Sequence, residues 1–166
     1  MDAVSWLDLS TDNCSIQRAL GVVGEKWTLL IIRDAMNGVR RFDDLRRHVG
    51  LSDPVLSDRL RKLVAAGILE TRPYRVERQR SRLEYRLTER GRDLQPALVA
   101  LLQWGDRHLA GSEGPPIEVL HRDCGAPLRA VVECTGEHVE VGPDGTVIRP
   151  LPAARRQIAP RRPRDP

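Results

Sequence analysis

Two arginine-rich segments carry the side chains of this chain best suited to bind another molecule. The first runs from Pro54 to Ala66, where Leu56, Leu60 and Leu63 recur at the spacing of one helix face. The second is the segment 72–82, which holds five arginines and little that could pack in a core. Cations on one surface repel one another unless an anion lies among them, and a nucleic-acid backbone supplies phosphates. The segments therefore predict a nucleic-acid interface, with a solvated charged surface as the alternative.

The helix 54–66 would present its polar face to the major groove, where each base pair shows a different pattern of donors and acceptors. A hairpin tip beside it would place its arginines on phosphates or in a narrow minor groove. The candidate DNA contacts are Arg40, Arg41, Ser52, Pro54, Val55, Ser57, Asp58, Arg61, Lys62, Arg75, Arg78, Arg80 and Arg82. Asp58 is unusual on such a face. It would either accept a hydrogen bond from cytosine or hold Arg61 and Lys62 in place.

Cys14 is the candidate sensor of a chemical signal. A helix is predicted from Cys14 to about Val22, which puts the thiol in the first turn, where the helix dipole favours the reactive thiolate. Arg18 would add to this effect, and Asp12 would oppose it. Because cysteine is also a common small core residue, an inert buried thiol is the alternative.

Four side chains near the C-terminus have types that bind zinc. They are His121, Cys124, Cys134 and His138, and structural zinc takes four nitrogen or sulfur ligands. Two alternatives stay open: an ordinary β-hairpin with two unpaired thiols, or a redox pair of Cys124 and Cys134. Zinc is the one cofactor that the sequence raises, and none is required by its other motifs. No Ser-His-Asp arrangement, glycine-rich phosphate loop or pair of buried carboxylates is apparent, so we do not expect an enzyme.

Charge is concentrated in the middle of the chain. The 166 residues carry a net charge of +4, whereas residues 40–92 hold 15 Lys or Arg against 8 Asp or Glu. The basic surface is therefore local, which is the electrostatic pattern of a nucleic-acid-binding protein. Three widely spaced cysteines argue against a disulfide framework and favour a reducing compartment. Since no signal-peptide pattern or long apolar run occurs, we expect a cytoplasmic protein with no membrane partner.

Hydrophobic periodicity and glycine stops divide residues 13–110 into helix, helix, short strand, helix, helix, strand, loop, strand and helix. The predicted helices span 14–22, 26–36, 43–49, 54–66 and 88–109, and the predicted hairpin strands span 68–71 and 83–87. Pro96 lies inside the last helix and predicts a kink or a late start there. This order is that of a winged helix-turn-helix, in a mostly α fold with a small β part (α+β).

The remaining segments differ in composition from this domain. The predicted organisation is an N-terminal arm at 1–12, the winged helix-turn-helix domain at 13–110, a small β appendage at 115–149 and a disordered basic tail at 150–166. The appendage has short runs rich in Val and Ile between turn residues. The tail is rich in Pro and Arg and has no hydrophobic period.

Five separated blocks of sequence resemble one known family. They are 24–34 (GEKWTLLIIRD), 41–45 (RFDDL), 55–63 (VLSDRLRKL), 67–69 (GIL) and 84–91 (EYRLTERG), and together they resemble the HxlR-type winged-helix regulators. The resemblance covers about residues 13–107. It implies a homodimer joined by the first and last helices and a palindromic operator on double-stranded DNA. It also implies that the protein usually represses and sometimes activates transcription.

The same resemblance implies a role for the first cysteine. Several HxlR-type regulators sense oxidants, electrophiles or quinone-like compounds through a cysteine at the start of the first helix, where Cys14 stands. The family usually has proline next, whereas Ser15 follows here. A small-molecule effector is the other signal considered, with Trp27 and Trp104 as core residues that could also line an interface cavity. The competing hypothesis is a ligand- or redox-sensing protein without sequence-specific DNA binding, which the intact arginines of helix and loop disfavour.

Overall fold

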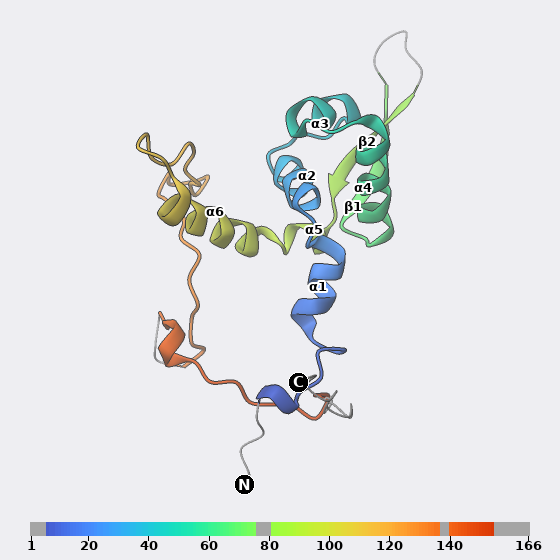
Figure 1. Ribbon diagram of the computed structural model, residues 1–166. Helices are drawn as coiled ribbons and strands as arrows, with labels where there is room; N and C mark the ends of the chain where they lie inside the picture. The colour runs from blue at the N-terminus through green and yellow to red at the C-terminus, as the bar shows by residue number, and fades with distance from the viewer. Residues whose placement is uncertain (1–5, 76–80, 137–139, 155–166) are drawn as a thin grey trace, which may run out of the picture.

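The computed structural model describes residues 6–75, 81–136 and 140–154 and has the predicted winged helix-turn-helix fold (Figure 1). Its elements are the 3-10 helix η1 (Trp6–Asp8), α1 (Ser15–Val23), α2 (Lys26–Met36), α3 (Phe42–Val49), α4 (Asp53–Ala65), β1 (Leu69–Tyr74), β2 (Arg82–Leu87), α5 (Glu89–Arg92), α6 (Gln95–Leu109) and the 3-10 helix η2 (Pro143–Gly145). The first four predicted helices agree with α1 to α4 to within one residue at each end, whereas the helix predicted over 88–109 is divided into α5 and α6. Among the described residues, none of the helices has the length and apolar character that crossing a bilayer requires.

The core lies where α2, α3 and α4 pack against one face of the hairpin. Its buried side chains are Ile31, Ile32, Leu45, Val49, Leu56, Leu60, Leu63, Ile68 and Leu69. The leucine stripe of α4 is fully covered, as its spacing predicted. Full burial of one such side chain contributes roughly 1.5–3 kcal/mol, which makes this stripe the main force that orients α4.

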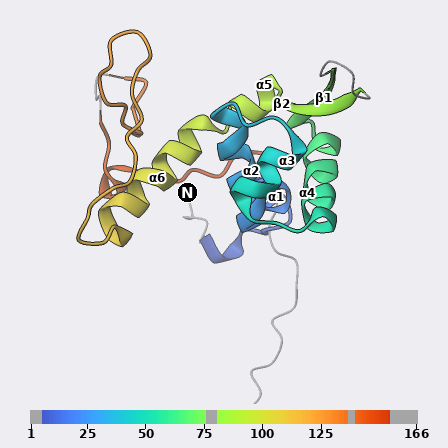
Figure 2. The same ribbon diagram turned by 90° about the horizontal axis from the view of Figure 1, so that it is seen from above.

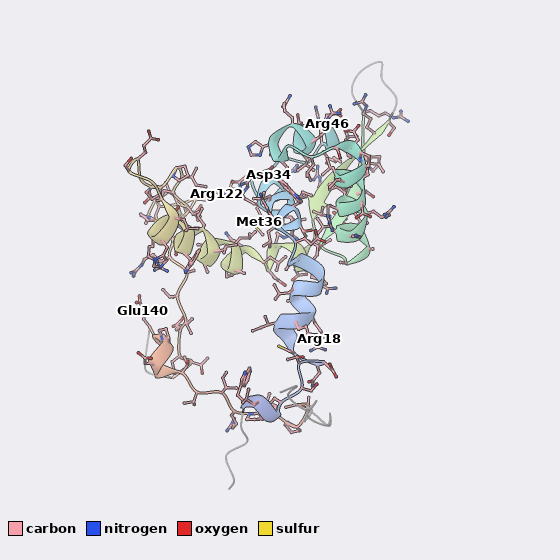
Figure 3. All side chains as sticks on the ribbon, viewed as in Figure 1. Arg18, Asp34, Met36, Arg46, Arg122 and Glu140 are labelled. Carbon is pink, nitrogen blue, oxygen red and sulfur yellow. The ribbon has the colours of Figure 1, made fainter. Side chains whose placement is uncertain are left out.

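Asp34 adds a polar anchor to this apolar core. Asp34, labelled in Figure 3, is 1% exposed near the end of α2, and its carboxylate accepts hydrogen bonds from Arg33 at 2.9 and 2.7 Å. Nδ1 of His48, on α3, lies 2.6 Å from its other oxygen. A buried carboxylate needs such partners, so this contact ties α3 to α2.

The hairpin is antiparallel, with Leu69 opposite Leu87 and Tyr74 opposite Arg82. The segment before α3 extends it, because the Tyr85 amide donates to the Arg40 carbonyl at 2.8 Å. Tyr85 and Leu87 pack on the core, whereas Leu83, on the same face of the strand, is half exposed. The inward alternation therefore ends where the hairpin runs past the helices (Figure 1).

A tight junction joins the hairpin to α5. The Thr88 hydroxyl accepts from the Gly91 amide at 3.1 Å, which caps α5, and donates to the Gly67 carbonyl at 2.6 Å. Gly91 is buried, and a Cβ atom there would overlap the carbonyl of Ile68. The α6 helix begins beyond this junction with Pro96 in its first turn, which is the late start rather than the kink.

The C-terminal segment differs from the predicted β appendage. Within its described residues it contains one isolated bridge, between Leu120 and Pro127, and η2, but no paired strand. Beside that bridge, the Leu128 amide donates to the Val119 carbonyl and the His121 amide to the Ala126 carbonyl, both at 2.8 Å. The Gln103 side chain of α6 also holds this backbone, because it donates to the Leu128 carbonyl at 2.7 Å and accepts from the Ala130 amide at 3.0 Å. Figure 2 shows this segment beside the far part of α6.

Replacing Asp34 by alanine should lower the free energy of unfolding by about 2 kcal/mol, because Arg33 and His48 lose a buried hydrogen-bonding partner. Urea denaturation at neutral pH measures this. Asp44→Ala is the matched control, since its 2.8 Å pair with Arg47 lies at the surface, and it should cost less than about 1 kcal/mol. Equal losses in both variants would show that Asp34 does not anchor α3.

Candidate nucleic-acid interface

The outward face of α4 gathers the residues that the sequence singled out on this helix. Ser52, Pro54, Val55, Ser57, Arg61 and Lys62 are exposed, and Asp58 is half-buried among them. Ser52 is the N-cap residue, but its side chain makes no capping hydrogen bond. The burial of Leu56, Leu60 and Leu63 on the opposite side turns all of these groups toward solvent together.

Asp58 is joined to both neighbouring cations. Its carboxylate forms an ion pair with Lys62 at 2.7 Å and another with Arg61. Hydrogen bonding from Lys62, and to a smaller extent from Arg61, holds the pKa of the Asp58 carboxyl below its usual range. Of the two roles that the sequence left open, the structure favours the one in which Asp58 holds Arg61 and Lys62 in place.

The turn between α3 and α4 is fixed at both the backbone and the side chains. Gly50 follows α3 with φ of 76°, a left-handed conformation that glycine adopts without strain. Arg46, labelled in Figure 3, donates to Asp53 at 2.9 Å across the turn. This hydrogen bond, together with the charge of Asp53, raises the pKa of Arg46. The two helices of the helix-turn-helix are therefore joined along one edge.

Arginines from three other segments border this edge. The Arg41 guanidinium stacks on the Tyr74 ring at 4.8 Å, and Arg82 pairs with Asp43 of α3 at 3.1 Å. Arg40 and Arg75 are exposed. Arg78 and Arg80, also predicted contacts, lie outside the described residues. The base of the wing and the start of α3 thus bring cations to the same side of the molecule.

Sequence reasoning missed two features of this surface. A cleft of about 670 Å³ runs between α3 and the segment before it, and Arg47 lines it together with Arg40, Arg41 and the Asp44 carboxylate. The run of basic residues at the end of α3, from Arg46 to His48, could have indicated Arg47 as part of this surface. Arg59 of α4, in contrast, turns inward to pair with Glu25 at the start of α2. No local pattern indicates that long-range pair.

Cys14 is half-buried and is the N-cap residue of α1, because the helix begins one residue later than predicted. Its carbonyl accepts from the Arg18 amide at 3.0 Å, while the Arg18 guanidinium is directed to the Ser15 hydroxyl at 3.3 Å. The thiol therefore lies at the start of a helix and is partly accessible to solvent.

The predicted zinc ligands are described only in part. Nδ1 of His121 lies 3.1 Å from Sγ of Cys124, and Cys134 is half-buried. His138 lies outside the described residues, and no group of three or more His, Cys, Asp or Glu side chains able to hold a metal ion occurs within the described ones. Zinc binding by His121, Cys124, Cys134 and His138 stays a prediction.

A family model and a sequence relative both match this chain to helix-turn-helix proteins. Residues 22–113 match the model of the HxlR-like helix-turn-helix family. An HTH-type transcriptional regulator of Mycobacterium tuberculosis strain H37Rv is 45% identical over 157 residues, which cover 95% of this chain and 98% of the relative. That match includes the C-terminal segment as well as the winged helix.

Two solved structures are similar in fold. The crystal structure of PA1607 matches with a TM-score of 0.74 and 33% identity, covering 84% of this chain and 96% of that one. The redox regulator HypR in its oxidized form matches with a TM-score of 0.53 and 30% identity, covering 59% of this chain and 100% of that one. The HypR match therefore leaves a larger part of this chain unmatched than the PA1607 match does.

The Asp58 carboxyl should titrate below the ordinary aspartate pKa of about 3.9 in an NMR pH titration. Its ionised form is favoured in the folded protein, so its contribution to stability is present above that pH and is lost as the pH falls through the lowered value. Lys62→Gln should raise the pKa of Asp58 more than Arg61→Gln does, because the Lys62 hydrogen bond is the larger cause. An unmoved titration in Lys62→Gln would contradict the pairing.

Proposed function

The chain belongs to the HxlR-like helix-turn-helix family, and from this premise we propose that it is a cytoplasmic transcriptional repressor. It acts as a homodimer on a palindromic operator in double-stranded DNA. One observation carries the proposal: the buried leucine stripe of α4 turns a largely polar face outward, and the exposed Arg41 and Arg82 lie against the hairpin and α3 of the same helix-turn-helix. Such a helix fits the major groove, and flanking arginines fit the backbone on either side.

The division of labour on this surface follows from its chemistry. Arg61, Ser57 and Ser52 stand where a helix in the groove reaches base edges, so they determine sequence preference. Arg41, Arg47, Arg75 and Arg82 are exposed outside α4, so they contact phosphates and supply affinity that depends on salt.

Exposed apolar side chains support the homodimer. Neither α1 nor α6 buries a single residue, and Ile16, Leu20, Leu101 and Trp104 are exposed on them. Apolar side chains exposed together on a helix are typical of an interaction site in a globular protein. Trp27, in contrast, packs on the core of its own domain.

The signal that releases DNA is oxidation of Cys14 or a small-molecule effector. Support for oxidation comes from the position of Cys14 at the start of α1, on the dimer-forming helix, and from the similarity to HypR, which is described as a redox regulator. A change in the thiol would alter the packing of α1 against the second copy and thereby the spacing of the two α4 helices.

Replacing Arg78 and Arg80 together by alanine should weaken binding to every duplex. The slope of log affinity against log salt should fall by up to about two phosphate contacts. Fluorescence anisotropy over a salt series measures this. Arg122→Ala with Arg129→Ala removes the same charge from the C-terminal segment and should leave the slope unchanged. If both double variants change the slope equally, the wing has no special place in the interface.

A mild thiol oxidant should reduce operator affinity by about fivefold or more in the wild-type protein and leave Cys14→Ser unaffected. Cys124→Ser is the matched control, because it removes an exposed thiol far along the chain and should respond like wild type. A response that disappears in Cys124→Ser but persists in Cys14→Ser would move the sensor to the C-terminal segment. No response in any of the three proteins would favour the small-molecule effector.

A further inference from the structure

A cleft of about 720 Å³ opens where the hairpin meets the end of α2 and the beginning of α6. Its described lining comes from α2, β1, β2, α5 and α6 together with Arg40, and Figure 1 shows α5 between β2 and α6 at this place. We name it the junction cleft. None of its described lining residues belongs to α3 or α4. It is therefore separate from the helix-turn-helix, and its size is that of a small-molecule site.

Positive charge predominates in the junction cleft. Four arginines and two glutamates are among the described residues that line it. Two of the arginines are neutralised on the outward face of the hairpin, where Arg72 pairs with Glu70 at 2.8 Å and Arg86 pairs with Glu84 at 2.6 Å. Glu70 lies opposite Arg86 in the strand register, and Arg72 lies opposite Glu84. These four side chains thus form a network without net charge beside the cleft.

The other two arginines keep their charge. Arg40 and Arg92 form no ion pair with any residue that the structure describes. Arg92 is nevertheless held in place, because its guanidinium donates to the Leu87 carbonyl at 2.8 Å. Glu89 is the remaining acidic group in the described lining and offsets only one of the two charges. Since guanidinium groups bind carboxylates through two parallel hydrogen bonds, these arginines favour an anionic ligand.

Apolar side chains complete the lining of the junction cleft. Met36, labelled in Figure 3, and Leu87 are half-buried there, and Ala35 lies beside them. No aromatic ring occurs among the described lining residues. Methionine is flexible and adapts to the shape of what it contacts. The lining therefore suits an anion that carries a short aliphatic chain.

Arg40 connects the junction cleft with the surface assigned to DNA. It also lines the cleft of about 670 Å³ beside α3, together with Arg41 and Arg47. The Arg40 carbonyl accepts from the Tyr85 amide at 2.8 Å, which fixes its backbone to the hairpin, whereas its exposed side chain makes no hydrogen bond within the described structure. One side chain between two clefts can serve a ligand in either of them.

We propose that the junction cleft binds a small aliphatic organic acid, whose carboxylate is held by Arg40 and Arg92. The aliphatic chain lies against Met36 and Leu87. The bound acid draws Arg40 away from the DNA backbone, so it lowers the affinity for DNA. This second step rests on the proposed function, whereas the binding of the acid does not.

Titration of the full chain with hexanoate, followed by the NMR shifts of backbone amides, tests the site without DNA. Hexanoate should bind saturably. Hexanamide, which lacks the charge, and acetate, which lacks the chain, should each bind at least about fivefold more weakly. A failure of hexanoate to saturate any shift would overturn the site, and equal binding of hexanamide would overturn the role of the arginines.

Substitutions assign the binding to the junction cleft. Arg40→Ala and Arg92→Ala should each weaken hexanoate binding at least about fivefold. Arg90→Ala is the matched control, because it removes the same charge from α5 outside the described lining, and it should leave the constant within about twofold of wild type. Arg40→Ala removes no hydrogen bond of the described fold, so its loss of binding is not a loss of folding. Equal effects of all three substitutions would overturn the assignment.

Anisotropy with a duplex selected from a random library tests the link to DNA. Saturating hexanoate should lower the affinity of the wild type about threefold or more, relative to sodium acetate of equal concentration, which matches the ionic strength. In Arg40→Ala, hexanoate should have no such effect. If hexanoate binds but the DNA affinity stays the same, the link is wrong and the site stands. If Arg92→Ala loses DNA affinity without hexanoate, the cleft belongs to the DNA surface and the proposal is wrong. A wild type that binds no duplex would overturn the proposed function, while the hexanoate titration still decides the site.

Discussion

The burial of the α4 leucine stripe is the constraint on which the rest of the structure depends. Leu56, Leu60 and Leu63 are inaccessible against α2, α3 and the hairpin, and this fixes the rotation of α4 about its own axis. Once that rotation is set, the α4 residues that lie between the buried leucines in the sequence face solvent. The polar outward face is therefore a consequence of core packing, and DNA recognition needs no separate folding determinant.

Acidic residues organise the basic surface that this rotation exposes. Asp58 holds Arg61 and Lys62, and Asp53 holds Arg46 across the turn. Each of these exposed pairs contributes little to stability, so positioning is their more useful effect. An arginine already restrained near its contact loses less side-chain entropy when it binds a phosphate or a base.

Periodicity and turn residues predict the winged helix well, because they are local signals. The 3-4 spacing of α4, the Thr88 cap and the late start of α6 at Pro96 each depend on a few neighbouring residues. The contacts of Asp34 with His48 and of Arg59 with Glu25 depend on how the helices pack, so the spacing of residues in the sequence does not predict them. The C-terminal segment has Val- and Ile-rich runs with the composition of strands, but within its described residues the backbone pairing stops at one isolated bridge. The Gln103 side chain of α6 supplies further hydrogen bonds to it, and no local pattern indicates that contact.

The central claim is that two copies of this winged helix read DNA sequence symmetrically. Selection of binding sites by the full chain from a random double-stranded library tests it most directly. The account predicts that recovered duplexes carry two inverted copies of one short sequence, with centres about one helical turn (roughly 10 base pairs) or a multiple of it apart. Recovered duplexes with no common sequence, or with a single unpaired half-site, would contradict it.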